Sequence, residues 1–184
     1  MKKVISLIMS ILLVLNLGVV AEASSVVLPN VDTNMHLYMD YRKITDTNSV
    51  QYKYQEKCRT NAYGIRVYDG YLAVAIGDFY STNIGDTYHV LLENGTEFDI
   101  FVADSKGSTG GLKVGTKTIN YDGEDCMNIL EFVVDEDLML NKIKCLGTFS
   151  GLDIFGGLYG NGGNIKEMTY TGHISISNDI LEEG

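Results

Sequence analysis

The chain has 184 residues and a formal net charge of −10 at pH 7, from 24 acidic and 14 basic side chains. So strong a negative charge repels nucleic acid and anionic lipid surfaces, and it therefore argues against both as partners. Hydrophobic residues make up 45% of the chain, so it is long and apolar enough to bury the core of one ordinary domain.

The first residues have the pattern of an export signal. Lys2 and Lys3 precede an apolar run over residues 4–20, and Ala21-Glu22-Ala23 supplies the small-x-small site that a signal peptidase cleaves. The run is short for a membrane span, so cleavage is favoured over a retained anchor. We expect residues 1–23 to be a signal peptide. The mature protein is then secreted, either extracellular or associated with the cell wall, with no membrane contact after cleavage.

Three cysteines follow the predicted signal, namely Cys58, Cys126 and Cys145. An oxidising compartment allows one disulfide, and the odd count leaves at least one thiol free or paired between chains. No Cys-x-x-Cys or His-x-x-x-His spacing occurs, so the sequence gives no indication of a structural metal site or a cofactor. We expect the cysteines to be buried and inert.

Residues 24–60 are predicted to be an extended N-terminal segment with one strand. Residues 24–34 are polar and contain Pro29, the single proline, so an extended arm is expected there. Further along, Val50, Tyr52 and Tyr54 alternate with polar neighbours. This period of two predicts a half-buried strand over residues 50–55.

Residues 61–178 are predicted to form an all-β domain. Asp69-Gly70 and Asn94-Gly95 are tight-turn signals, because glycine adopts a positive φ at little cost. Short apolar runs beside them predict strands over residues 63–68, 71–76, 87–92, 98–103 and 129–134. Many short strands with no long helical period indicate a barrel or a sandwich.

The other segments carry weaker signals. Residues 105–121 are a polar, Gly-rich connection, and a short helical turn is expected over residues 136–140. Residues 145–163 contain two Gly-Gly pairs and are predicted to be a wide hairpin or a mobile loop. A last strand over residues 164–176 and an acidic, frayed tail over residues 179–184 complete the chain.

Three pieces of the central region resemble a known fold family. An apolar strand ends in Asp78 and leads to Ile84-Gly85, and a second ends in Val102-Ala-Asp104 before Gly107. The third piece is Asn128-Ile-Leu-Glu131 before apolar residues. Together they resemble the "3D" domain of secreted bacterial cell-wall proteins, whose relatives include a lytic transglycosylase domain and expansins. The resemblance covers somewhat over a third of the chain and implies a six-stranded double-psi β-barrel.

The chain also departs from the pattern of that family. The family's Asp-Thr-Gly-Gly loop is replaced by a longer one that begins at Asp104, and its third aspartate is Glu131. The proline expected after the first aspartate is Phe79. These differences argue against catalysis more than they argue against the fold.

Acidic residues at strand ends are the candidate catalytic groups, namely Asp104, Asp78 and Glu131. In the transglycosylase that the chain resembles, an aspartate of this barrel protonates the glycosidic oxygen, which makes Asp104 the candidate general acid. A second carboxylate would stabilise the positive charge that develops on the sugar. The alternative, which we favour, is that Asp104 accepts main-chain N–H bonds and shapes the turn after its strand.

Lys106 and Tyr80 are the candidates for contact with a ligand. Tyrosine is frequent, with 12 residues, while tryptophan is absent. An aromatic surface for stacking on sugar rings would draw on Tyr38, Tyr41, Tyr52, Tyr54, Tyr80 and Tyr159. The favoured alternative is that these rings cover the edge of the barrel.

Two main hypotheses on function follow. The first is a secreted, non-catalytic module of the bacterial cell envelope that binds peptidoglycan, another wall glycan or an envelope protein. The second is a peptidoglycan-cleaving enzyme that uses Asp104 as its acid. A third is a partner protein in a secretion or mobile-element system.

Overall fold

The computed structural model describes residues 24–28, 34–77, 80–81, 83–106, 116–119, 125–147, 149 and 165–176. The predicted signal peptide and the acidic tail lie outside these residues. The elements are β1 (Ser25–Val26), β2 (Asn34–Asp40), η1 (Tyr41–Lys43), α2 (Val50–Lys57), β3 (Arg59–Thr60), β4 (Arg66–Tyr68), β5 (Tyr71–Ile76), β6 (Asp86–Leu92), β7 (Glu97–Ser105), β8 (Thr116–Ile119), β9 (Asp125–Val134), α3 (Asn141–Leu146) and β10 (Ile165–His173). In this described part of the chain, no helix has the length and apolar character needed to cross a membrane.

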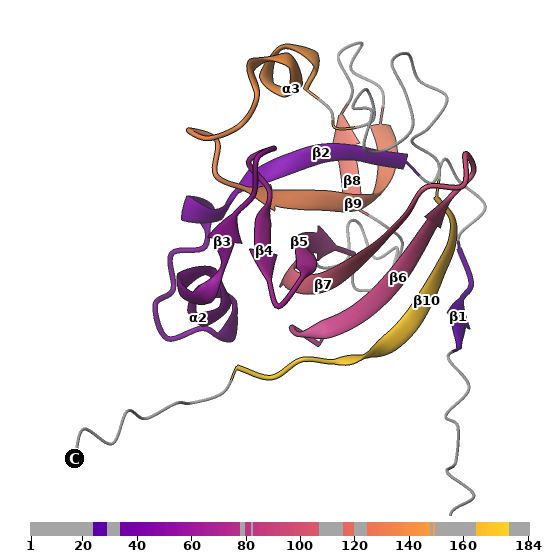
Figure 1. Ribbon diagram of the computed structural model, residues 1–184, viewed down its shortest axis with the longest axis horizontal. Helices are drawn as coiled ribbons and strands as arrows, with labels where there is room; N and C mark the ends of the chain where they lie inside the picture. The colour runs from indigo at the N-terminus through magenta and orange to yellow at the C-terminus, as the bar shows by residue number, and fades with distance from the viewer. Residues whose placement is uncertain are drawn as a thin grey trace, which may run out of the picture.

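The strands form one mixed sheet, which confirms the prediction of an all-β fold (Figure 1). Its main path runs β1-β10-β6-β7-β5-β4-β3, and β9 pairs with β5, β2 and β8. Two of the pairings, β5 with β7 and β2 with β9, are parallel. Among the described residues no pairing joins β1 to β3 or to β2, so the sheet is open.

The two predicted tight turns are confirmed. Asp69 and Gly70 have φ values of 50° and 88° and connect the antiparallel strands β4 and β5. Gly95 has a φ of 86° in the turn between β6 and β7, where its N–H donates to the carbonyl of Leu92 at 3.0 Å. Both turns need a left-handed backbone, which glycine adopts without the clash of a Cβ.

Strand β5 is buried on both faces and divides the core into two clusters. Val74 and Ile76 lie in the larger cluster, while Ala73 and Ala75 lie in the smaller one. The smaller cluster also contains Tyr54 of α2, so this helix packs over that face of the sheet. Side chains in a strand alternate between faces, which explains why a continuous apolar run serves both clusters.

The predicted strand over residues 50–55 is wrong, because this segment belongs to helix α2. Ser49 caps the helix: its hydroxyl accepts from the N–H of Tyr52 at 3.1 Å and donates to the carbonyl of Asp46 at 2.7 Å. Only Tyr54 and Gln55 of the helix are buried, and they precede the buried Cys58. The alternating pattern was a coincidence of composition, and the cap decided the local structure.

Three smaller expectations also need correction. Residues 136–138 form a hydrogen-bonded turn, in which the N–H of Leu138 donates to the carbonyl of Asp135 at 3.1 Å, and the helix α3 begins only at Asn141. The connection over residues 105–121 contains a strand, β8, which pairs with β9. In residues 63–68 the continuous strand begins at Arg66, because Asn61 accepts from the N–H groups of Tyr63 and Ile65 and makes a turn.

The structure gives two cysteines as free thiols, Cys58 and Cys145. Cys58 is buried, as expected, whereas Cys145 is exposed, so the prediction of a buried thiol is wrong for Cys145. The side chain of Cys126 lies outside the described residues.

Candidate functional site

Two of the predicted acidic residues are placed by the same residue of the central strand. Ala75 of β5 is paired with Asp104 of β7 on one side and with Glu131 of β9 on the other. Residues that face each other across a sheet point to the same face. Asp104 and Glu131 therefore share the face of the sheet on which α2 lies.

A bulge in β7 makes this arrangement. Val74 pairs with Val102 and Ala75 pairs with Asp104, so Ala103 is an extra residue in β7. A bulge of this kind re-aims the side chain that follows it. Strict alternation would instead direct Asp104 to the opposite face, beside Val102 in the larger apolar cluster.

Glu131 is buried and carries an ion pair. Its side chain is 7% exposed and contacts the ammonium group of Lys106, which is 25% exposed. The N–H of Lys106 donates to the carbonyl of Ile76 at 2.8 Å, which fixes the main chain at the end of β7. A buried carboxylate without a partner would be costly, so Lys106 has a structural reason to lie here.

Asp104 is half-buried, and its pKa is raised. Burial is the largest cause, because it disfavours the charged carboxylate, and the negative charge of Glu131 acts in the same direction. The N–H of Ser105, the charge of Lys106 and a side-chain hydrogen bond with Gln51 act in the opposite direction. The group thus holds its proton to a higher pH than an exposed aspartate does.

The site therefore combines Asp104, whose pKa is raised, with the ion pair between the carboxylate of Glu131 and the ammonium group of Lys106. The main chains of β7 and β9 are two strand spacings apart, about 10 Å, with β5 between them. Because Glu131 is already ion-paired with Lys106, it is not free to act as a base.

Tyr80, the remaining predicted site residue that the structure describes, does not join this cluster. Asp78 lies outside the described residues. Tyr80 belongs to the larger apolar cluster, on the opposite face from Glu131. There the hydroxyl of Tyr88 donates to the Tyr80 carbonyl at 3.1 Å, and burial raises the pKa of the Tyr80 hydroxyl.

Gln51 is the site residue that the sequence prediction missed. It lies in the first turn of α2, and the helix places its amide at Asp104. The available signal was the start of that helix: Asp46, Asn48 and Ser49 are all residues that favour turns and N-caps.

The tyrosines predicted as one stacking surface are separated in the fold. Tyr54 is 1% exposed and packs against the rings of Phe101 and Tyr68. Tyr38 contacts Phe149 edge-on, with 6.1 Å between ring centroids, and Tyr159 lies outside the described residues. Of the described tyrosines in this set, Tyr41 and Tyr52 line a common open groove, which lies between η1 and α2.

Comparison of the chain with protein-family models, curated proteins and solved structures gave no match. The interpretation of the site therefore depends on its own geometry.

Proposed function

We propose that the protein is an exported, non-catalytic module of the bacterial cell envelope that binds a wall glycan such as peptidoglycan. The ion pair between Lys106 and Glu131 is the observation that carries this proposal. An acid–base enzyme needs a second carboxylate that is free to act on water or on the sugar, and here that carboxylate is already neutralised. An envelope protein is the other class of partner.

We also propose that the sheet belongs to the double-psi β-barrel type. The apolar strands of the three sequence pieces that carry the resemblance are β5, β7 and β9, and β5 lies between the other two in the sheet. The parallel pairing of β5 with β7, with the antiparallel β6 between them in sequence, is the kind of interlaced connection that such a barrel requires.

A second candidate function is glycan cleavage with Asp104 as the general acid. The raised pKa of Asp104 favours it, because a carboxyl group that keeps its proton towards neutral pH can protonate a leaving oxygen. In that mechanism Glu131 and Lys106 would fix the electrostatic surroundings of Asp104.

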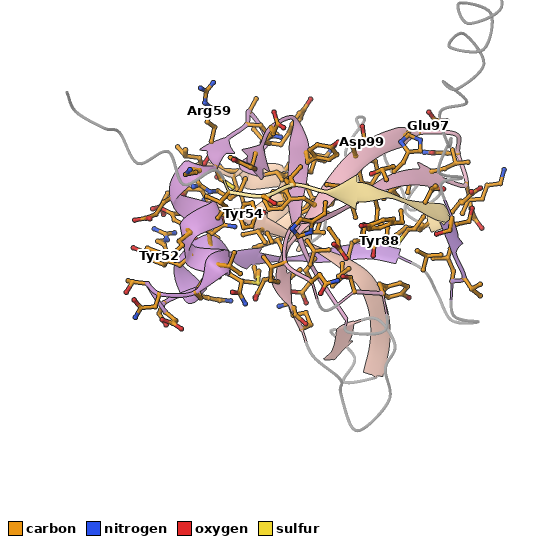
Figure 2. The ribbon with its side chains drawn as sticks, turned by 90° about the horizontal axis from the view of Figure 1, so that it is seen from below. Tyr52, Tyr54, Arg59, Tyr88, Glu97 and Asp99 are labelled. Atoms are coloured by element: carbon orange, nitrogen blue, oxygen red, sulfur yellow. The ribbon has the colours of Figure 1, made fainter. Side chains whose placement is uncertain are left out.

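Purified cell walls separate the two functions. The wild type, Asp104→Asn and Glu97→Gln would each be mixed with walls, and both turbidity and sedimented protein would be measured. Glu97 is a matched control, because it is an exposed carboxylate at the other end of β7 (Figure 2). We expect wild-type protein and Glu97→Gln to sediment with the walls and to leave the turbidity unchanged.

Two outcomes contradict the proposal. Loss of turbidity with the wild type and with Glu97→Gln, but not with Asp104→Asn, would establish the enzyme instead. Absence of the wild type from the wall pellet, at low and at moderate salt, would rule out glycan binding and leave the envelope protein as the partner class.

A further inference from the structure

A second open groove, of about 590 Å³, lies between the C-terminal end of α2 and the hairpin of β4 and β5. It is lined by Lys57, Arg59, Val67, Tyr68, Asp69 and Gly70. Both cations are exposed, and Figure 2 shows the side chain of Arg59 extending away from the body of the molecule. With two cations and one carboxylate in its lining, this basic groove has the opposite charge to the chain as a whole, which carries −10.

The last described residues of the chain lead towards the basic groove. After β10, the N–H of Ile174 donates to the carbonyl of Gly85 at 2.9 Å, and the hydroxyl of Tyr54 donates to the carbonyl of Ile174. Ile176 packs against the smaller apolar cluster, as does Tyr68, which lines the groove. Figure 1 shows this stretch leaving the sheet and running past α2. The chain is therefore held as far as Ile176, on the cluster that also supports one wall of the groove.

The residues that follow Ile176 carry charges complementary to those of the basic groove. Asp179, Glu182 and Glu183 supply three carboxylates, and the apolar pair Ile180-Leu181 lies between them in the sequence. An extended residue spans about 3.3–3.6 Å, so all of these side chains lie within about 25 Å of Ile176. The acidic tail is long enough to reach the groove and has an apolar centre to pack on its half-buried wall.

The attachment at Ile176 favours the tail over a free anion as the occupant. Exposed ion pairs contribute little by themselves, so a separate anion would be held weakly. A segment joined to its site by a few residues has an effective concentration in the millimolar range, so that weak contacts suffice to hold it. The net charge of −10 repels a free anion from the whole molecule, whereas it drives a tethered acidic segment towards a basic surface.

We propose that the acidic tail, residues 179–184, docks in the basic groove of its own chain. Its carboxylates pair with Arg59 beside Lys57, and its apolar pair packs on the ring of Tyr68. The docked tail covers the cations through which an anionic polymer would bind, so it closes this surface to such ligands. This arrangement replaces the frayed tail that the sequence predicts. The inference does not depend on the proposed glycan binding.

Relaxation of backbone nitrogen-15 in the protein without its predicted signal tests the docking. At low salt we expect order parameters above about 0.8 for residues 179–183, the range of a rigid backbone, and values below about 0.6 in about 1 M salt. Arg59→Glu should lower them below about 0.6 at low salt. Lys144→Glu makes the same change in net charge at an exposed residue of α3, outside the groove, and should leave them unchanged. Adding Glu182→Arg to Arg59→Glu should restore part of the order.

Four results would overturn the inference. Order parameters below about 0.6 in the wild-type tail at low salt mean that it is not docked. Equal losses in Arg59→Glu and Lys144→Glu mean that net charge, and not the basic groove, orders the tail. Order parameters that rise with protein concentration assign the tail to the groove of a second copy. A flexible tail, together with amide shifts of Lys57 and Arg59 on addition of polyphosphate, assigns the groove to an external anion.

The outcome is independent of the folding of any one variant and of the wall assay. Should Arg59→Glu not fold, Glu182→Arg with Glu183→Arg decides the same question, because these changes lie in the tail itself. They should release the tail at low salt as Arg59→Glu does. Sedimentation of the wild type with cell walls tests the proposed function, and neither result of the relaxation experiment alters that test.

Discussion

Asp104 and Glu131 are paired with one and the same residue, Ala75, from opposite sides of β5. Their positions are therefore set by the hydrogen-bonded register of three strands and not by the connections between those strands. This places the polar cluster on central strands of the sheet, where both faces are covered by apolar side chains.

Replacement of Asp104 by asparagine should stabilise the protein at neutral pH. The raised pKa of Asp104 means that its stabilising contribution is present below about pH 4, the value of an unfolded aspartate, and is lost as the pH rises through the folded pKa. Asp104→Asn should then have a larger free energy of unfolding than wild type at pH 7 and a similar one at pH 3. Urea unfolding at the two pH values measures this. If Asp104→Asn is instead less stable than wild type at pH 7 and equally stable at pH 3, the charged carboxylate shapes the turn.

Removing one partner of the ion pair between Lys106 and Glu131 should lower the free energy of unfolding far more than removing both. Lys106→Met leaves a buried carboxylate without its cation, and we expect a loss of about 3 kcal/mol in the free energy of unfolding. The double variant Lys106→Met, Glu131→Leu should recover most of that loss. Lys53→Met, at an exposed lysine, is the control. Glu131→Leu alone completes the comparison: if the losses in the two single variants add up in the double variant, the pairing is contradicted.

Gly85 should not tolerate alanine. Its φ is 105°, and a Cβ there would lie 2.6 Å from both the carbonyl oxygen of Ile174 and the hydroxyl of Tyr54. We expect Gly85→Ala to lower the free energy of unfolding by more than about 2 kcal/mol. Gly95→Ala has a similar φ of 86° with no atom within 4 Å of the added Cβ, so it should cost only about 1 kcal/mol. Thermal unfolding of both variants separates the clash from the backbone strain.

The two free thiols should react at very different rates in the folded protein. Burial raises the pKa of Cys58 to about 12, so at pH 8 this thiol is neutral as well as covered. Cys145 is exposed on α3. Iodoacetamide at pH 8, followed by mass spectrometry of peptides, should find Cys145 modified and Cys58 unmodified until urea is added. Equal modification without urea would contradict the described burial.

The strands of the central region were largely predictable because their limits are set locally. The pairs Asp69-Gly70 and Asn94-Gly95 fix two hairpins, and the strand over Tyr71–Ile76 is recovered with the same limits. Helix α2 was not predicted, because Val50, Tyr52 and Tyr54 have the alternating pattern of a strand while the hydroxyl of Ser49 caps the start of a helix. Local alternation is a weaker determinant than a satisfied cap when few residues are buried.

The candidate site was predictable in part for the same reason. The strand ends indicated that Asp104 and Glu131 lie near each other, and pairing with Ala75 places both on one face of the sheet. The ion pair of Lys106 with Glu131 was not predicted. Gln51 contacts Asp104 only through the packing of α2 on the sheet, which no spacing in the sequence reveals.

The unpaired residue Ala103 makes the face on which Asp104 lies depend on the bulge in β7. Shortening the strand by Ala103 would restore regular pairing and still leave the aspartate opposite Ala75. Closing the bulge without shortening the strand would turn the carboxyl group into the apolar cluster that contains Val102 and Ile76. Homologous chains or designed variants should therefore keep this polar cluster through many side-chain exchanges and through loss of Ala103, yet lose it where the bulge closes by a one-residue shift of register.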